Sequence, residues 1–172
     1  MRIFRPNLTY QSFLDIDIKL LLEKNVKTLL IDLDNTLVAH DASLPTKEVF
    51  DFINKVKNNN INIIIISNNT KERVELFVKE LDVPYYHFAC KPSKITYKKI
   101  IKELNPSLKI ACVGDQILTD VFGGNRMKFI TIYTKPLFKK DLSFTKINRI
   151  FEKMILNNLE KNNKLNIGEY YE

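Results

Sequence analysis

The sequence predicts an α/β protein built on one doubly wound parallel sheet with helices on both faces. Short apolar runs, typical of buried strands, alternate along the chain with longer segments whose apolar residues recur at helical spacing. This alternation favours strand–helix–strand units, whose strands run parallel because each helix returns the chain to the same end of the sheet. Several of the apolar runs end in a polar or charged residue, so reactive side chains are expected at one edge of that sheet.

The predicted elements alternate from the first helix to the last strand. Thr70 is a suitable N-terminal cap because its hydroxyl can accept a hydrogen bond from the first helical turn. Pro45 and Pro92 suit the start of a helix, whereas Pro106 stops one. In chain order, the sequence predicts a helix from Ile18 to Val26, a strand at 29–31, a helix after Pro45, a strand at 61–66, a helix after Thr70, a short strand at 83–88, a helix after Pro92, a strand at 110–113, a short helix at 119–123 that Gly123 and Gly124 end, and a strand at 129–133.

Two aspartates one residue apart follow the first predicted strand. Because side chains alternate along a strand, Asp32 and Asp34 should project together from its carboxyl end, where open α/β sheets bind their ligands. Two carboxylates at such a distance repel each other unless a cation or a shared proton offsets them. A divalent metal would do so and would free one carboxylate to act as a nucleophile. Taken alone, the pair is also typical of a solvated acidic turn.

Further reactive side chains follow the later strands in a regular order. Ser67 ends the second strand, Lys91 follows the short third one, and Gly114-Asp115 ends the next, with Asp120 five residues after Asp115. An acid pair, a hydroxyl, a lysine and a second acid pair should therefore meet at one edge of the sheet. Four such groups in order favour a catalytic site over an acidic turn.

These motifs resemble those of the haloacid dehalogenase (HAD) superfamily of phosphotransferases. The match covers DxDNT at 32–36, Ser67, Lys91 and GDxxxxD at 114–120. The local sequences, such as SNN at 67–69, are similar to the YqeG-like subfamily, which includes the phosphatidylglycerophosphate phosphatases of mitochondria and plastids. The resemblance runs from about Ile3 to Pro136.

The resemblance implies a hydrolase that uses Mg²⁺ and forms an aspartyl-phosphate. It implies Asp32 as the nucleophile and Asp34 as the acid that protonates the leaving oxygen and then deprotonates water. Asp115 would join Asp32 and the backbone carbonyl of Asp34 as ligands of Mg²⁺, which prefers oxygen. The remaining implied roles are catalysis assisted by Ser67 and Lys91, phosphate binding by Ser67, Asn68 and Lys91, and support by Thr36 and Asp120, the latter orienting Lys91 or a metal-bound water.

The chain of 172 residues is long enough for one domain with its own core. We expect a single HAD-like phosphatase domain over 1–172, with a Rossmann-like core at about 26–136 and a C-terminal amphipathic helix and polar tail at about 141–172. HAD enzymes often insert a cap domain in one of two segments, which here lie between Thr36 and Ile63 and between Ser67 and Lys91. Both segments are too short for one. We therefore expect a capless site that is open to a large substrate.

The composition is that of an ordinary globular protein, with 45% hydrophobic and 27% charged residues. A net charge of +7 suits a phosphorylated or anionic membrane substrate, although we attribute most of it to a composition rich in Lys, Asn and Ile. No apolar run approaches the ~20 residues of a spanning helix, and the N-terminus lacks the apolar block of a signal peptide. We expect a cytoplasmic protein, peripheral on the inner face of the membrane if its substrate is a lipid. Cys90 and Cys112 are expected to be reduced and partly buried.

Three functions remain open. The leading one is a Mg²⁺-dependent phosphomonoesterase that acts on phosphatidylglycerophosphate, an anionic phospholipid at the membrane surface. The alternatives are a phosphatase of another large substrate, such as a phosphoprotein or a nucleic-acid end, and a non-catalytic binding module, which the complete set of motif residues argues against. We expect no nucleic-acid partner, and the sequence does not indicate an oligomeric state.

Residues outside the motifs are interpreted as structural. His40 is expected in a solvated loop, His87 in a structural role, and Arg126 on the surface rather than on a second phosphate. A C-terminal apolar stripe flanked by lysine and arginine is expected to pack on the domain rather than on a membrane. The stripe consists of Ile147, Ile150, Phe151, Met154 and Ile155, flanked by Lys146, Arg149 and Lys153.

Overall fold

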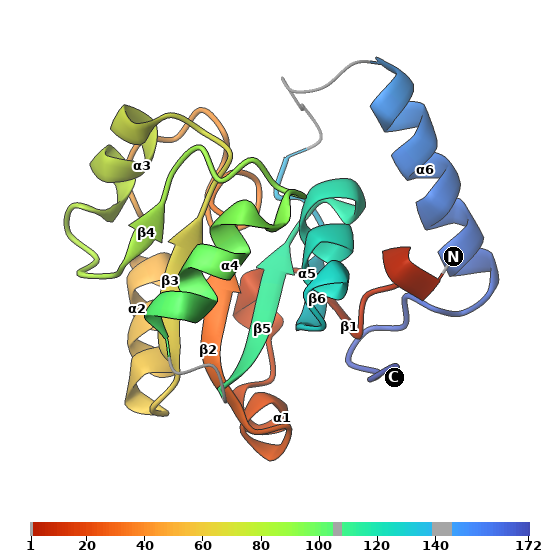
Figure 1. Cartoon of the computed structure of the whole chain (residues 1–172), viewed down its shortest axis with the longest axis horizontal. Helices are drawn as coiled ribbons and strands as arrows, with labels where there is room; N and C mark the ends of the chain where they lie inside the picture. The colour runs from red at the N-terminus through yellow and green to blue at the C-terminus, as the bar shows by residue number, and fades with distance from the viewer. Residues whose placement is uncertain (1, 105–107, 139–145) are drawn as a thin grey trace.

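The structure is a computed structural model that describes residues 2–104, 108–138 and 146–172. Within these residues, six parallel strands form one sheet in the order β1-β6-β5-β2-β3-β4 (Figure 1). From β2 the chain proceeds outward to β3 and β4 and then crosses to β5, so its direction reverses between β2 and β5. The predicted doubly wound sheet is confirmed. The strands are β1 (Leu8–Tyr10), β2 (Val26–Ile31), β3 (Asn62–Ile66), β4 (Tyr85–Tyr86), β5 (Lys109–Gly114) and β6 (Ile130–Thr134).

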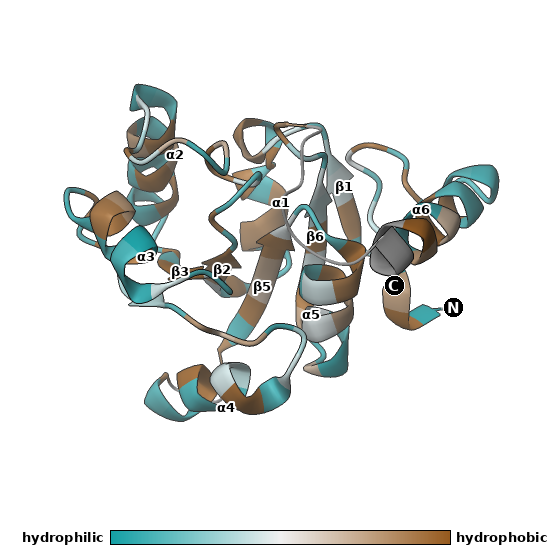
Figure 2. Cartoon of the chain, turned by 90° about the horizontal axis from the view of Figure 1, so that it is seen from above, coloured by the Kyte–Doolittle hydropathy of each residue, from teal (hydrophilic) through white to brown (hydrophobic). Residues whose placement is uncertain are grey.

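Helices cover both faces of this sheet. Apolar side chains of α1, α2 and α3 pack on one face, and those of α4 pack on the other, where α5 also lies (Figure 2). Strands covered on both faces must be apolar on both, which explains why β2, β3 and β5 read as continuous apolar runs. The helices are α1 (Ile18–Glu23), α2 (Lys47–Asn58), α3 (Lys71–Val78), α4 (Lys94–Glu103), α5 (Phe122–Arg126) and α6 (Lys146–Lys161).

Three parts of the fold differ from the prediction. The sequence does not predict β1, a three-residue strand that is completed by pairing with β6. Val26, expected in the first helix, is the buried first residue of β2, because the chain turns at Asn25 in the left-handed conformation with a φ of 60°. The helix predicted at 119–123 is a π-helical turn at Ile117–Val121 that continues into α5.

Two glycines lie inside α5 and do not end it, contrary to the prediction. A Cβ atom at Gly123 would lie 2.9 Å from the Tyr97 hydroxyl, and one at Gly124 would lie 2.6 Å from Cγ2 of Thr131. Both distances are too short for a carbon contact. The glycines therefore allow α5 to pack closely on α4 and β6, which outweighs their low helix propensity.

The C-terminal helix α6 packs beside the sheet through Ile155 and Leu159. Ile150 and Met154 are exposed, so the expectation that the stripe packs on the domain is wrong for them. Phe151 is partly exposed, but its ring packs edge-on against that of Phe4, with the ring centroids 6.5 Å apart. Helical rotation explains the outward direction of Ile150 and Met154, each of which directly precedes a position on the face shared by Phe151, Ile155 and Leu159.

The predicted C-terminal segment is described in part. Residues 141–145 and the side chains of 146–149 lie outside the described residues, as does Pro106. The tail after α6 returns to β1, where the amide of Gly168 donates to the carbonyl of Thr9 at 3.0 Å. The sheet and its contacts thus extend beyond the core expected at 26–136.

The segments that could hold a cap domain contain little structure. Residues 35–61 hold α2 as their helix, and residues 68–90 hold α3 and the short strand β4. Both segments are described in full, so the predicted absence of a cap domain is confirmed. Among the described residues, no helix is long and apolar enough to cross a membrane.

Candidate active site

The predicted catalytic residues meet at the carboxyl edge of the sheet. Asp32 follows β2 directly, and Ser67 and Asp115 follow the two strands that flank it, β3 and β5. Lys91 comes from the segment after β4. This segment is held beside the end of β3, because the amide of Ala89 donates to the carbonyl of Ser67 at 2.9 Å. The topology thus gathers residues that are up to 83 positions apart in the chain at the reversal between β2 and β5, where α/β sheets bind ligands.

Lys91 is buried at the centre of the site and pairs with two carboxylates. Its Nζ lies 2.5 Å from Oδ1 of Asp32 and 2.7 Å from Oδ1 of Asp120. The side chain of Asn68 holds the backbone of Lys91 through two hydrogen bonds. Its Nδ2 donates to the Lys91 carbonyl at 3.0 Å, and its Oδ1 accepts from the Lys91 backbone amide at 2.7 Å. The side chain of Asn68 is therefore engaged with Lys91, and phosphate binding by this residue stays a prediction for its backbone amide.

Asp120 is held in turn by the segment that carries it. Its Oδ2 accepts from the Gln116 amide at 3.2 Å and lies 3.3 Å from the Thr119 hydroxyl. Of the two roles predicted for Asp120, these contacts favour the orientation of Lys91. Gly114 makes room for this arrangement, since a Cβ atom there would lie 2.2 Å from Cγ of Asp120. The glycine of the GDxxxxD motif is thus required by a close approach.

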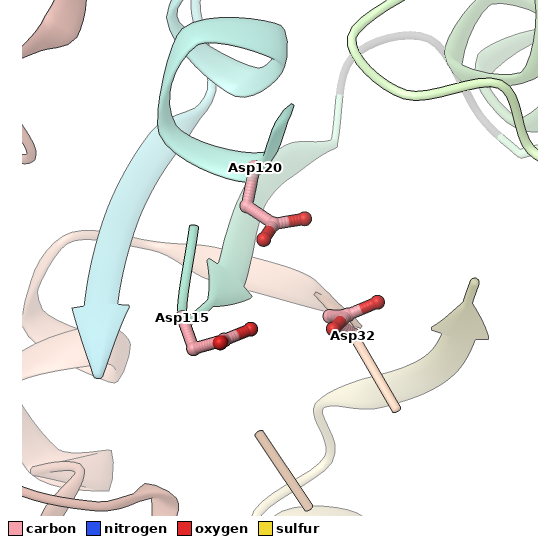
Figure 3. A group of neighbouring side chains, drawn as sticks. All are labelled: Asp32, Asp115 and Asp120. Atoms are coloured by element: carbon pink, nitrogen blue, oxygen red, sulfur yellow. The ribbon is translucent and has the colours of Figure 1, made fainter. Parts of the chain in front are cut away.

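Three buried carboxylates gather around one small space. Figure 3 shows Asp32, Asp115 and Asp120 directed toward it, each with an oxygen within 4.8 Å of the others. The Thr36 hydroxyl lies 3.2 Å from Oδ1 of Asp115 and 3.5 Å from Oδ2 of Asp32, which fits its predicted supporting role. With Lys91 as the nearby cation, the group keeps a net double negative charge when ionised. This donor set of hard oxygens fits a divalent cation such as Mg²⁺.

The pKa values of Asp32 and Lys91 reflect this excess of negative charge. Burial raises the pKa of Asp32 to about 7 against the attraction of Lys91, and repulsion from Asp120 adds to the rise. Burial by itself lowers the pKa of Lys91, but the attractions of Asp120 and Asp32 outweigh it and raise that pKa above its usual range. Lys91 therefore stays charged, whereas Asp32 ionises near neutral pH without a further cation.

Asp34 turns its carboxylate to a different set of partners. Nη2 of Arg73 lies 3.0 Å from Oδ1, Nδ2 of Asn69 donates to Oδ2 at 3.2 Å, and Nδ1 of His40 lies 3.6 Å from Oδ1. His40 lies in a turn and its side chain is 37% exposed, as expected for a loop histidine, but it also approaches a site residue. Sequence reasoning missed Arg73 and Asn69. Their position in the chain could have indicated them, because the residues between Ser67 and the first turn of the next helix start from the same sheet edge.

The turn that carries Asp34 folds back on β2. Asn35 adopts the left-handed conformation with a φ of 62°, which asparagine tolerates better than most residues. Its amide donates to the carbonyl of Val38 at 2.7 Å, which closes the turn. The turn holds Asp32 and Asp34 at fixed positions beside Ser67, which is buried and whose Oγ accepts from the Asn69 amide at 3.0 Å.

The remaining candidates have other contacts. Arg126 donates to the Pro92 carbonyl at 3.1 Å and stacks over Phe122, so it is a partly buried structural residue rather than a surface one. His87 contacts the ring of Phe88 and lies outside the acidic cluster, as expected for a structural residue. Both cysteines are free, but Cys90 is exposed, which corrects the expected partial burial, and Cys112 is buried in β5.

Two comparisons with known sequences match most of the chain. The family model of mitochondrial PGP phosphatases matches residues 1–138. The chain is 35% identical over 162 residues to the Bacillus subtilis (strain 168) protein named "Probable phosphatase YqeG", in a match that covers 93% of this chain and 94% of that protein.

Two solved structures resemble the fold. A Vibrio cholerae protein described as a 3-deoxy-D-manno-octulosonate 8-phosphate phosphatase has a TM-score of 0.45 and 15% identity, covering 88% of this chain and 94% of its own. A Legionella pneumophila protein described as a HAD superfamily (subfamily III A) hydrolase has a TM-score of 0.46 and 19% identity, covering 86% and 92%. The family match spans the sheet and every predicted catalytic residue, and the chain belongs to the mitochondrial PGP phosphatase family and is a phosphatase.

Proposed function

We propose that this protein is a Mg²⁺-dependent phosphomonoesterase that forms an aspartyl-phosphate on Asp32 and hydrolyses phosphatidylglycerophosphate at a membrane surface. The observation that carries the proposal is the position of Asp32. It is buried, forms an ion pair with Lys91, and is one of three converging carboxylates at the carboxyl edge of the sheet.

The proposed chemistry proceeds in two steps. An oxygen of Asp32 attacks phosphorus, the bond from phosphorus to the ester oxygen breaks, and Asp34 gives its proton to the leaving alcohol. Asp34 then takes a proton from water, the resulting hydroxide attacks phosphorus, and inorganic phosphate leaves with Asp32 restored. Lys91 and Ser67 would bind the phosphoryl oxygens, a role that is supported by their position near Asp32 at the sheet edge.

Mg²⁺ would be held by Asp32, Asp115 and the backbone carbonyl of Asp34. When bound, it would offset the negative charge of the carboxylates and of the phosphoryl oxygens. The buried carboxylates are arranged before substrate arrives, so little reorganisation is needed when charge develops.

A lipid substrate is supported by apolar residues around the site. Leu44 follows β2, Phe88 follows β4, Ile95 lies in the first turn of α4, and Leu137 and Phe138 follow β6; all five are exposed, and we call them the apolar rim. Each one follows the carboxyl end of a strand, so the rim shares the edge of the sheet with the site. Exposed apolar groups at a functional edge are typical of a surface that meets a membrane or a protein.

Two backbone contacts tie the apolar rim to the catalytic turns. The Leu137 amide donates to the Asn35 carbonyl at 2.9 Å, and the Phe88 amide donates to the Asn69 carbonyl at 2.9 Å. Insertion of the rim into a bilayer would therefore bring Asp32 toward the headgroups. Anionic lipids would add attraction to a chain with a net charge of +7.

The exposed apolar residues of α6 can extend this surface. Glu152 accepts from the Ile117 amide at 2.6 Å, which joins the middle of α6 to the segment that follows Asp115. Ile150 and Phe151, next to Glu152 in the helix, are exposed. Together with the open, capless edge, these features favour a substrate that is held in a membrane.

Phosphate release from phosphatidylglycerophosphate in vesicles tests the proposal. The wild type should release phosphate with Mg²⁺ and stop when EDTA removes it, and Asp32→Asn should be inactive. Asp51→Asn, which changes an exposed aspartate of α2, is the matched control and should be fully active. Turnover in EDTA, or a soluble sugar phosphate with a higher kcat/KM than the lipid, would contradict the metal or the lipid part, respectively.

A further inference from the structure

Arg73 has more hydrogen-bonding capacity than its contacts use. It lies in the first turn of α3, and its side chain is 15% exposed. Its Nη2 pairs with Asp34, and its guanidinium lies over the ring of Phe77 at 5.9 Å. Its Nη1 is buried and, among the described residues, has no hydrogen-bond partner.

A buried nitrogen of this kind requires an acceptor. The guanidinium carries five N–H donors in a rigid fork, and a donor that is left without an acceptor is costly away from water. An oxyanion beside Nη1 would satisfy it, since arginine suits the geometry of phosphate and carboxylate groups. The unused side of the fork thus indicates a ligand with an anionic oxygen.

The position of Asp34 indicates which part of a substrate would supply that oxygen. Under the proposed function, on which this inference rests, Asp34 protonates the ester oxygen, so it faces the leaving alcohol. Arg73 contacts the same carboxylate and therefore borders the alcohol. Lys91, which serves the transferred phosphoryl group, is engaged with Asp32 and Asp120 instead.

We propose that Arg73 is a specificity residue that binds a second anionic group in the alcohol part of the substrate. The preferred substrates are then phosphomonoesters whose alcohol carries a further anion a few bonds from the ester oxygen, a class to which the phosphodiester of phosphatidylglycerophosphate belongs. Arg126, the sequence candidate for a second phosphate, is engaged with the Pro92 carbonyl.

Two soluble substrates test this role without a membrane. Glycerophosphoglycerophosphate carries a phosphodiester in its alcohol, whereas glycerol 3-phosphate lacks it. Arg73→Gln should lower kcat/KM for the first substrate about tenfold more than for the second, mainly by raising KM, because one charge-assisted hydrogen bond is lost. Arg73→Lys should restore part of the difference. Lys71→Gln, in the same helical turn and paired with Glu75, is the matched control and should change neither substrate.

Binding separates this inference from the proposed function. Calorimetry on the Asp32→Asn background should show that Arg73→Gln weakens glycerophosphoglycerophosphate about tenfold and leaves glycerol 3-phosphate unchanged. Equal losses for both substrates would mean that Arg73 acts only by positioning Asp34, and this would overturn the inference. Binding that depends on Arg73 in a wild type that hydrolyses neither substrate would overturn the proposed function and leave the inference intact.

Discussion

Replacing Asp32 by Asn should stabilise the metal-free protein at neutral and alkaline pH, even though the change removes the proposed nucleophile. The pKa of Asp32 is raised from an ordinary value of 3.8 to about 7, first of all by burial. The folded state therefore holds this proton more tightly than the unfolded state does. The resulting contribution to stability is fully present below about pH 4 and is lost as the pH rises through about 7.

The size of the effect follows from the same pKa. The interval from 3.8 to about 7 is about three pH units, and each is worth about 1.4 kcal/mol, so the ionised carboxylate costs about 4 kcal/mol at most. Asparagine has nearly the shape of the carboxyl group and carries no charge, so it should avoid most of this cost. A gain of this size corresponds to a rise in Tm of roughly 10 °C for a protein of this length.

Urea unfolding in EDTA at about pH 5 and about pH 8 measures this difference. Asp32→Asn should exceed the wild type in free energy of unfolding at the higher pH, with a smaller gap at the lower one, and Mg²⁺ should stabilise the wild type more than the variant. Asp51→Asn serves as the exposed control. A variant less stable than the wild type at both pH values would refute the reasoning, because the Asp32–Lys91 pair would then stabilise the fold more than burial of the charge opposes it.

Three further changes test other parts of the site. Asp115→Asn should raise the Mg²⁺ concentration for half-maximal phosphatase activity by at least about tenfold, a loss of ~1.4 kcal/mol in binding; an unchanged Mg²⁺ dependence would remove Asp115 from the ligands. Gly114→Ala should cost about 1–3 kcal/mol in urea unfolding and most of the activity, because the new Cβ overlaps Asp120; wild-type stability and rate would contradict the close approach. Phe88→Ser should weaken co-sedimentation with anionic vesicles and leave turnover of a soluble phosphate ester unchanged, whereas Ile3→Ser, an exposed change outside the apolar rim, should alter neither; equal vesicle binding by both variants would contradict the membrane role of the rim.

The parts of the fold that could be predicted are those encoded in short, continuous segments. The strands that become β2, β3 and β5 are buried on both faces and therefore read as apolar runs. Parallel connections then require that residues after these strands, such as Asp32, Ser67 and Asp115, lie at one edge. Local pattern and topology together were enough to predict that these residues lie at one edge of the sheet.

The parts that could not be predicted depend on contacts between distant segments. β1 has three residues and exists because β6, more than 120 positions later, completes its hydrogen bonds. Gly123 and Gly124, seen in isolation, resemble the end of a helix. They are instead required because the side chains of Tyr97 and Thr131 leave no room for a Cβ atom.

The partners of Asp34 are of the same kind. Arg73 lies 39 positions after Asp34. The residues around Arg73 are those of an ordinary solvated helix and give no sign of a site residue. Only the placement of α3 over the sheet edge brings its guanidinium to the carboxylate. Such contacts are beyond pattern recognition because neither residue carries a local signal of the other.

A rapid-quench experiment with ³²P-labelled phosphatidylglycerophosphate tests the central claim most directly. The label should appear on the chain within the first turnover and map to the peptide that contains Asp32. In Asp34→Asn, which lacks both the acid for the first step and the base for the second, the label should appear on the chain and leave it more slowly than in the wild type. Release of labelled phosphate with no label on the chain at any quench time, in the wild type and in Asp34→Asn alike, would contradict the aspartyl-phosphate and the role given to Asp32.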